Sequence, residues 1–495
     1  MYEVASIWRE RSRGLSAVAI APEPLDRFAS ILDEAEFDFF VETARVAKRL
    51  LAGRTLWNVT STARGGGVAE MLASLLPLAC GAGVDARWLV IEAEEAFFRL
   101  TKRIHHRLHG AIGDGGALGA DERAAYESML KSQGLALSRL LRAGDFVILH
   151  DPQTLGLAPA LRRLGATVIW RSHIGVDVPN DLVLGAWEFL GPYLAAADIF
   201  VFTRRSYAWT ELPAERVVVI PPSIDAFATK NQALVPEQVH GILVATGILD
   251  GKDGDAHYAK LDGSIHTVSR PSDLSGTARV PMGASIITQI SRWDPLKDPL
   301  GLITGFAEHI APRSDAHLVV AGPTVKAVSD DPEGAEIFAA VRASWRRLES
   351  GIRTRVHLAC LPMQDTEENA VIVNALQRRS SVVVQKSLAE GFGLTVAEAM
   401  WKERPIVAAR VGGIRDQLLD GVCGLLVDPT DLAAFGGAVI SLLENPSFAA
   451  SLASAARRRC CEEYLAPKHL MRYVTLFGSL LSGKTGSAAA SPLHG

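Results

Sequence analysis

The sequence predicts an α/β protein with two doubly wound domains, each a parallel sheet flanked by helices. Apolar runs of strand length alternate with helical segments in two separate stretches of the chain. A segment rich in Gly, Asp and Ser separates these stretches. The 495 residues, of which 48% are hydrophobic and 21% charged, suffice for several globular domains and exclude disordered or collagen-like chains.

The first alternating stretch, residues 55–222, is interpreted as the amino-terminal domain. Because helical segments lie between its apolar runs, we expect parallel strands joined by helical crossovers. The expected strands are LWNVT (56–60), ARWLVIEA (86–93), DFVILH (145–150), ATVIWRS (166–172), IFVFT (199–203) and VVVI (217–220).

The second alternating stretch, residues 284–465, is interpreted as the carboxyl-terminal domain. Its expected strands are ASIITQIS (284–291), AHLVVAG (316–322), RVHLAC (355–360), SSVVVQ (380–385) and PIVAA (405–409). The remaining segments are expected to be an N-terminal extension (1–54), a linker with a variable excursion (223–283), a C-terminal helix (466–481) and a disordered tail (482–495).

Charge and composition exclude several classes of protein. Lys and Arg total 51 against 55 Asp and Glu, so the net charge of −4 does not indicate a nucleic-acid binder. The five scattered cysteines form no CxxC pair, which argues against a disulfide framework and a zinc site. The chain has no apolar leader and no apolar run of about 18 residues, so we expect a cytoplasmic protein without a membrane span.

Ligands of doubly wound sheets bind at the carboxyl ends of strands, so two such domains facing across a cleft should build a site from loops of both. The first candidate loop is Gly65-Gly66-Gly67, between the expected strand 56–60 and a helix opening at Val68. Glycines allow a ligand to approach the backbone, and the helix start offers N–H groups to an anion. The alternative is a plain tight turn.

The second candidate is SRWDPLKDP (291–299), at the end of the expected strand 284–291. It places Arg292 and Lys297 five residues apart across a turn that contains proline and opens a helix. Two cations beside a helix start suit a diphosphate. The alternative is a solvated surface pair.

The third candidate, EGFGLTVAE (390–398), is the most specific. Glu390 lies on the loop after the expected strand 380–385, and a helix is expected to begin near Leu394. Glycines within the loop permit close backbone approach, and the first helical N–H groups would face a phosphate. Glu398, about one turn into the helix, could accept hydrogen bonds from ribose hydroxyls.

The fourth candidate combines HDPQ (150–153) and WRSHIG (170–175), each at the end of an amino-terminal strand. His150, Asp151 and His173 are polar groups at the points where apolar strands stop. Each histidine could equally be a satisfied core residue. Asn58, within Asn58-Val59-Thr60, matches a glycosylation acceptor, but we dismiss that match because it lies in an expected buried strand.

The E-x7-E spacing of Glu390 and Glu398, with Arg292 and Lys297 upstream, resembles the family 4 retaining glycosyltransferases of the GT-B fold. A broader set of motifs, covering residues 55–465, looks like the trehalose glycosyltransferring synthases. This set is STARGGGVAEML, RWLVI, EAFFRLTKRIH, HDPQ, WRSHI, PPSID with KN (230–231), SRWDPLKDP, DDPEG, NALQRRSSVVVQKSLAEGFGLTVAEAMWK and VGGI.

The resemblance implies that a nucleoside-diphosphate glucose donates glucosyl to free glucose with retention, giving α,α-trehalose reversibly. It implies no metal and no other cofactor, and a homodimer. The implied catalytic residues are His173, Arg292, Lys297 and Glu390, with the two cations on the diphosphate and His173 near the sugar's C6 hydroxyl. The implied donor-binding residues are Gly65, Gly66, Gly67, Gly391, Phe392, Gly393, Leu394, Thr395 and Glu398, and those for the acceptor are His150 and Asp151.

Two other readings remain open. A trehalose phosphorylase or a synthase with another acceptor would need an additional anion pocket, for which Arg64 and Lys102 are the candidates. A non-catalytic sugar-nucleotide sensor would be expected to lose one of its four charged groups, but Arg292, Lys297, Glu390 and Glu398 are all present. The chain also has Gly175 where the family tends to have Asp, and His105-His106 where it tends to have His-Asn.

Overall fold

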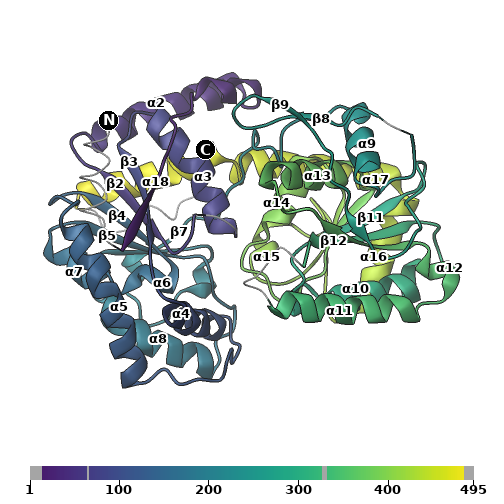
Figure 1. Ribbon diagram of the computed structural model, residues 1–495. Coiled ribbons are helices and arrows are strands. Elements are labelled where there is room, and N and C mark those ends of the chain that lie inside the picture. Colours follow the sequence, from purple (N-terminus) through teal and green to yellow (C-terminus); the bar gives the residue numbers. More distant parts are fainter. Residues whose placement is uncertain (1–13, 64–65, 253, 326–331, 484–495) are drawn as a thin grey trace. The chain divides into compact units, whose positions relative to one another are not determined.

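The computed structural model describes residues 14–63, 66–252, 254–325 and 332–483 (Figure 1). The chain divides into two compact units. Unit 1 comprises residues up to Ser223 together with those from Ala466 onward, and unit 2 comprises Ile224–Leu465. Residues 1–13 of the expected N-terminal extension and 484–495 of the expected tail lie outside the described residues.

The sheet of unit 1 is parallel except for its edge strand β1, which runs antiparallel to β3. β1 comes from the segment expected to be an extension; it is only four residues long, and its two central residues are exposed. In sheet order the strands are β1 (Leu15–Val18), β3 (Ala86–Ile91), β2 (Leu56–Thr60), β4 (Phe146–His150), β5 (Thr167–Ser172), β6 (Ile199–Phe202) and β7 (Val217–Val219).

Helices cover both faces of this sheet, as two separate apolar clusters show. One face packs against α4 (Glu95–Leu108), α5 (Ala120–Ser138), α6 (Asp151–Leu155), α7 (Ala158–Arg163) and α8 (Asp181–Leu194). The other packs against α2 (Glu34–Leu50), α3 (Gly67–Gly81) and α18 (Ala466–Leu481). Short 3₁₀ turns complete the unit: η1 (Asp26–Ser30), η2 (Arg205–Tyr207) and η3 (Ala214–Arg216).

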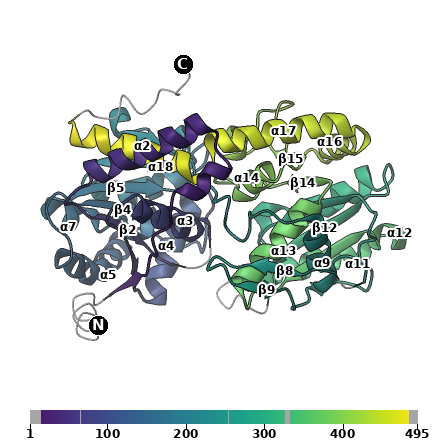
Figure 2. The same cartoon turned by 90° about the horizontal axis from the view of Figure 1, so that it is seen from above.

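The C-terminal helix α18 lies beside α2, although more than 400 residues separate them in the chain (Figures 1 and 2). Tyr473, Leu476 and Phe477 of α18 join the same cluster as Ala47 of α2. The helix expected at 466–481 therefore completes a layer of unit 1.

The sheet of unit 2 has the same design, with one antiparallel edge strand, β10, against β13. In sheet order the strands are β10 (Asp273–Leu274), β13 (Val356–Leu361), β12 (His317–Pro323), β11 (Ile286–Ile290), β14 (Val382–Gln385), β15 (Ile406–Ala409) and β16 (Leu425–Val427). A separate hairpin pairs β8 (His257–Ala259) with β9 (Ile265–Thr267).

Two apolar clusters again cover the two faces of the unit 2 sheet. Residues 235–283, expected to be a linker and excursion, form much of one of them, because Ile242, Leu249 and Val280 are buried against β11 and β12. The helices and turns of unit 2 are α9 (Pro236–Ala245), η4 (Pro295–Lys297), α10 (Pro299–Gly305), η5 (Phe306–Ile310), α11 (Pro332–Arg347), α12 (Ser350–Arg353), α13 (Thr366–Arg379), α14 (Leu394–Trp401), α15 (Ile414–Gln417), α16 (Leu432–Glu444) and α17 (Pro446–Glu463).

No single helix in the described ranges is both long and apolar enough to span a membrane. The adjoining pair α16 and α17 would meet that test together, but the two are bent by 102° at their junction.

Candidate functional site

Two sequence-predicted charges of unit 2 meet at the carboxyl edge of its sheet. Lys297 ends η4, which follows β11, and Glu390 lies on the loop after β14. Because β11 and β14 are parallel neighbours, their following loops emerge side by side. Lys297 Nζ lies 2.6 Å from Glu390 Oε2, and both side chains are largely buried.

The Glu390 carboxylate has further donors. Its Oε2 also accepts from Gln385 Nε2 at 3.4 Å and from Ser387 Oγ at 3.3 Å. Gln289 Nε2 donates to the carbonyl of Lys297 at 2.8 Å, which fixes the turn that carries the lysine. The ion pair is therefore held in place from both loops.

Arg292, the second expected cation, is placed differently. Its side chain is 68% exposed and pairs with Asp294 at 3.1 Å. Asp294 also caps η4, since its Oδ1 accepts from Leu296 N at 2.8 Å. Arg292 is thus a solvated cation near the Lys297 turn, with a side chain that can still reorient.

The loop before α14 needs glycine at Gly393. This residue has φ 91°, a left-handed conformation, and it is the N-cap of α14. Gln417 donates to the carbonyls of Phe392 and Gly393, and Gly413 N donates to Glu390 O at 3.2 Å. The first N–H groups of a helix have no acceptor within the helix, so those of Leu394 and Thr395 can receive an anion.

Gly393→Ala tests this loop. A Cβ there would lie 3.2 Å from Ile414 Cγ1 and 3.3 Å from Glu390 Cγ, in addition to the cost of the positive φ. We expect a loss of about 1–2 kcal/mol in the free energy of unfolding and weaker donor binding. The control is Gly351→Ala in α12, where an added Cβ meets nothing within 4 Å. Urea unfolding measures the loss of stability, and the KM for the donor measures the loss of binding. Equal values for Gly393→Ala and Gly351→Ala would contradict the requirement for glycine at position 393.

Glu398 is nearly buried within α14, at 5% exposure. Its Oε2 accepts from Gln377 Nε2 at 3.3 Å, and Lys230 Nζ lies 3.6 Å from its Oε1. Burial lowers the pKa of the adjacent Lys402 to about 7, an effect that the negative charge of Glu398 opposes. Glu398 is therefore fixed by polar neighbours rather than solvated on the helix surface.

The histidines of unit 1 also meet. His150 ends β4, and His173 follows β5, the neighbouring parallel strand. Their rings stack with centroids 5.4 Å apart, and His150 Nδ1 lies 3.1 Å from His173 Nε2. His150 Nε2 lies 3.1 Å from Asn58 Oδ1. His150 is 3% exposed, and both of its ring nitrogens have a partner; its role in acceptor binding stays a prediction.

Asp151 directly follows β4 and has φ 61°. Its Oδ1 accepts from His173 N at 2.8 Å, which ties the two strand ends together. Burial raises the pKa of Asp151 to about 7. Of the glycine loop, Gly66 is the N-cap of α3 with φ 84°, Gly67 begins that helix, and Gly65 lies outside the described residues.

A buried cation lies beside these histidines. Arg171 is 1% exposed and donates to Tyr473 Oη at 2.7 Å and to Ile220 O at 3.2 Å. Burial, reinforced by the Arg171 charge, lowers the pKa of His150 to about 3. The same causes, with the neighbouring histidines, lower the pKa of His173 well below its ordinary value. Both rings are therefore neutral at pH 7.

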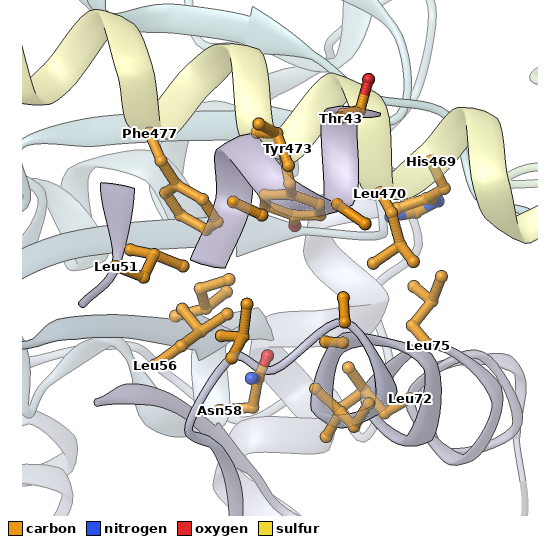
Figure 3. A pocket seen from close by; sticks show the side chains of 18 of the residues that line it. Thr43, Leu51, Leu56, Asn58, Leu72, Leu75, His469, Leu470, Tyr473 and Phe477 are labelled. Carbon is orange, nitrogen blue, oxygen red and sulfur yellow. The ribbon is translucent and has the colours of Figure 1, made fainter. Parts of the chain in front are cut away.

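A cavity of about 60 Å³ lies between α2, α3, α18 and the unit 1 sheet (Figure 3). Apolar side chains, Leu72 and Leu75 among them, line most of it, so it does not suit a hydroxyl-rich sugar. Its polar lining includes Asn58, His150 and His469. Within the described part of the chain neither ring nitrogen of His469 has a hydrogen-bond partner.

Sequence reasoning missed several residues of these sites. Asn58 drew notice only as a glycosylation match, and a single amide in an otherwise apolar strand is the signal that could have found it. Gln385 is likewise a polar residue at the end of an otherwise apolar strand, and Ser387 lies two residues further on, before the candidate loop. Lys230 belongs to the KN motif noted with PPSID, but no spacing in the sequence predicts that it reaches Glu398 from a segment far away in the chain.

Comparisons with known proteins show which family the chain is similar to. The family described as "Trehalose synthase, N-terminal domain" matches residues 58–209, and "Glycosyl transferases group 1" matches 276–459. The trehalose synthase of Rubrobacter xylanophilus is 34% identical over 451 residues, covering 90% of this chain and 94% of that protein.

Two solved structures share the fold at low sequence identity. An α,α-trehalose-phosphate synthase (UDP-forming) from Burkholderia vietnamiensis is 17% identical with a TM-score of 0.62, covering 86% of this chain and 99% of its own. Anabaena HepE, solved in complex with UDP and glucose, is 15% identical with a TM-score of 0.59, covering 86% and 100%.

The predicted two-domain α/β architecture is confirmed: the two units have the GT-B fold, and the chain is an enzyme of the glycosyltransferase type. The 34% identity to the Rubrobacter xylanophilus protein, over most of both chains, shows which glycosyltransferase family the chain belongs to. The chain belongs to the trehalose synthase family, and its chemistry is trehalose-related glycosyl transfer.

Proposed function

We propose that the enzyme transfers glucosyl from a nucleoside-diphosphate glucose to free glucose, with retention, and forms α,α-trehalose. The observation that carries the proposal is the Lys297–Glu390 pair at the carboxyl edge of the unit 2 sheet, beside the start of α14. In this proposal Lys297 and the α14 N–H groups bind the diphosphate, and Glu390 contacts the sugar. The complex of HepE with UDP and glucose supports a nucleotide-sugar donor.

Glucosyl transfer builds positive charge on the sugar and negative charge on the leaving diphosphate. Lys297, Arg292 and the helix start stabilise that negative charge, and so the proposal needs no metal ion. Arg292 would exchange its Asp294 partner for the phosphate. We further propose that the departing phosphate oxygen takes the acceptor proton on the same face of the sugar, which gives retention.

Product analysis by NMR tests the proposal. Purified protein is incubated with glucose and UDP-, ADP- or GDP-glucose in separate samples, each with and without EDTA. We expect an α,α-1,1-linked disaccharide from one donor, unchanged by EDTA. Loss of product with EDTA would contradict the metal-free part. If no donor gives trehalose, glucose 1-phosphate formed from trehalose and phosphate would identify a phosphorylase instead.

A further inference from the structure

His150 contacts His173, and Asn58 contacts His150. The proposed reaction gives neither Asn58 nor His150 a role. His150 Nε2 faces Asn58 Oδ1, and His150 Nδ1 faces His173 Nε2, each at 3.1 Å. An amide oxygen only accepts, so it requires a proton on His150 Nε2. A neutral imidazole has one N–H, so His150 Nδ1 must be an acceptor, and His173 Nε2 must be the donor.

We propose that Asn58 and His150 are positioning residues that hold His173 in the tautomer with the proton on Nε2 and a bare Nδ1. This proposal rests on the proposed function, because the bare Nδ1 would accept a hydrogen bond from a sugar hydroxyl. No described residue bonds to that nitrogen. His173 is partly exposed, whereas Asn58 and His150 are buried beneath it, at 2% and 3% exposure.

The charges around the pair keep both rings neutral, as this chain of bonds requires. Arg171 on β5 is buried, and no carboxylate among the described residues pairs with it. His469 on α18 faces the same region, and Asp151 binds the backbone of His173. A proton added to either histidine would sit beside the Arg171 cation. While both rings stay neutral, the His150–His173 pair keeps Nδ1 of His173 available as a hydrogen-bond acceptor.

NMR of the full-length protein with ¹⁵N-labelled histidine reads the tautomer directly, without any substrate. The His173 signals are assigned by their loss in His173→Gln. We expect a protonated Nε2 and an unprotonated Nδ1 at pH 7. In Asn58→Leu the acceptor is removed, and we expect the His173 ring to show a mixture of tautomers. A protonated Nδ1 in the unsubstituted enzyme would overturn the proposal.

Kinetics provide the second readout. His150→Phe keeps a stacked ring but removes the acceptor, and we expect kcat/KM to fall roughly tenfold, the effect of one hydrogen bond. His150→Asn places an amide oxygen near the position of Nδ1 and should recover most of that loss. Gln133→Leu, which removes another buried amide of unit 1, is the control for a purely structural effect. Equal losses in all three variants would contradict a positioning role.

The two hypotheses can fail separately. An enzyme that is inactive with every nucleotide glucose but has the expected His173 tautomer would contradict the proposed function alone. An active enzyme with the opposite tautomer would contradict the positioning role alone.

Discussion

Lys297→Met is expected to lower kcat/KM for glucosyl transfer by about 10²–10³-fold, the usual effect of removing one preorganised group that stabilises transition-state charge. Lys297 is a largely buried cation at the carboxyl edge of the unit 2 sheet, and methionine keeps its length without its charge. Transfer is measured with the donor that product analysis identifies. The loss should appear in kcat as well as in KM, because charge on the diphosphate grows toward the transition state.

Lys260→Met is the matched control. Lys260 also belongs to unit 2 and pairs with Asp365 at 2.7 Å, and its side chain is 17% exposed against 16% for Lys297. Its removal costs an equivalent ion pair away from the proposed site. We therefore expect near-normal turnover. Similar losses for both variants would show that Lys297 acts on folding rather than on the reaction.

The second large effect concerns acid stability. His150, His173 and His469 all have lowered pKa values in the folded state, chiefly because they are buried. The unfolded chain then binds more protons below pH 6.5, so the free energy of unfolding should fall as the pH drops through that value. With its pKa at about 3, His150 alone accounts for about 2 kcal/mol between pH 6.5 and 5.

Asp151 acts in the opposite direction. Its pKa of about 7 means that the folded state holds this proton more tightly than the unfolded chain does. Acidification toward pH 4 therefore stabilises the fold through Asp151. The three buried histidines contribute in the opposite direction, and together they outweigh this single carboxyl group. The net result remains a loss of stability in acid, measurable as a decrease in the urea midpoint.

His469→Phe separates one contribution. The variant keeps a ring stacked on Tyr473, whose centroid lies 5.4 Å away, and the adjacent cavity has room for the larger side chain. Removing two unpartnered buried nitrogens should raise stability at pH 7 by about 1–3 kcal/mol. It should also make the pH dependence shallower. Parallel stability curves for the variant and the unsubstituted enzyme would contradict this account.

The buried parallel strands were predictable because such strands are continuous apolar runs. LWNVT and DFVILH mark β2 and β4 within a residue. The candidate loops could be found because they directly follow these runs. β1 could not, since a short edge strand depends on pairing with β3 rather than on its own pattern. In residues 235–283 the apolar run from Ile242 to Leu249 is followed by a stretch rich in Gly, Asp and Ser, and its place in the core depends on contacts with β11 and β12.

Contacts between side chains depend on tertiary structure, and fewer of them could be predicted from the sequence. Lys297 and Glu390 were each found by position, but their mutual ion pair joins loops 93 residues apart. The unit to which α18 belongs could not be read from its sequence, because an amphipathic helix can cover either sheet. The link from Asn58 to His150 was equally hidden, because it spans 92 residues.

The return of the chain to unit 1 through α18 has a consequence for synthesis. All of unit 2 is translated between Ser223 and Ala466, before the helix that completes the α2–α3 layer exists. On the ribosome, unit 2 can therefore finish folding first. Until α18 is synthesised, the face of the unit 1 sheet that carries α2 and α3 stays partly uncovered. A chain that ends just before Ala466 would contain all of unit 2 but would lack the helix that covers one face of the unit 1 sheet. Completion of unit 1 therefore depends on synthesis of α18.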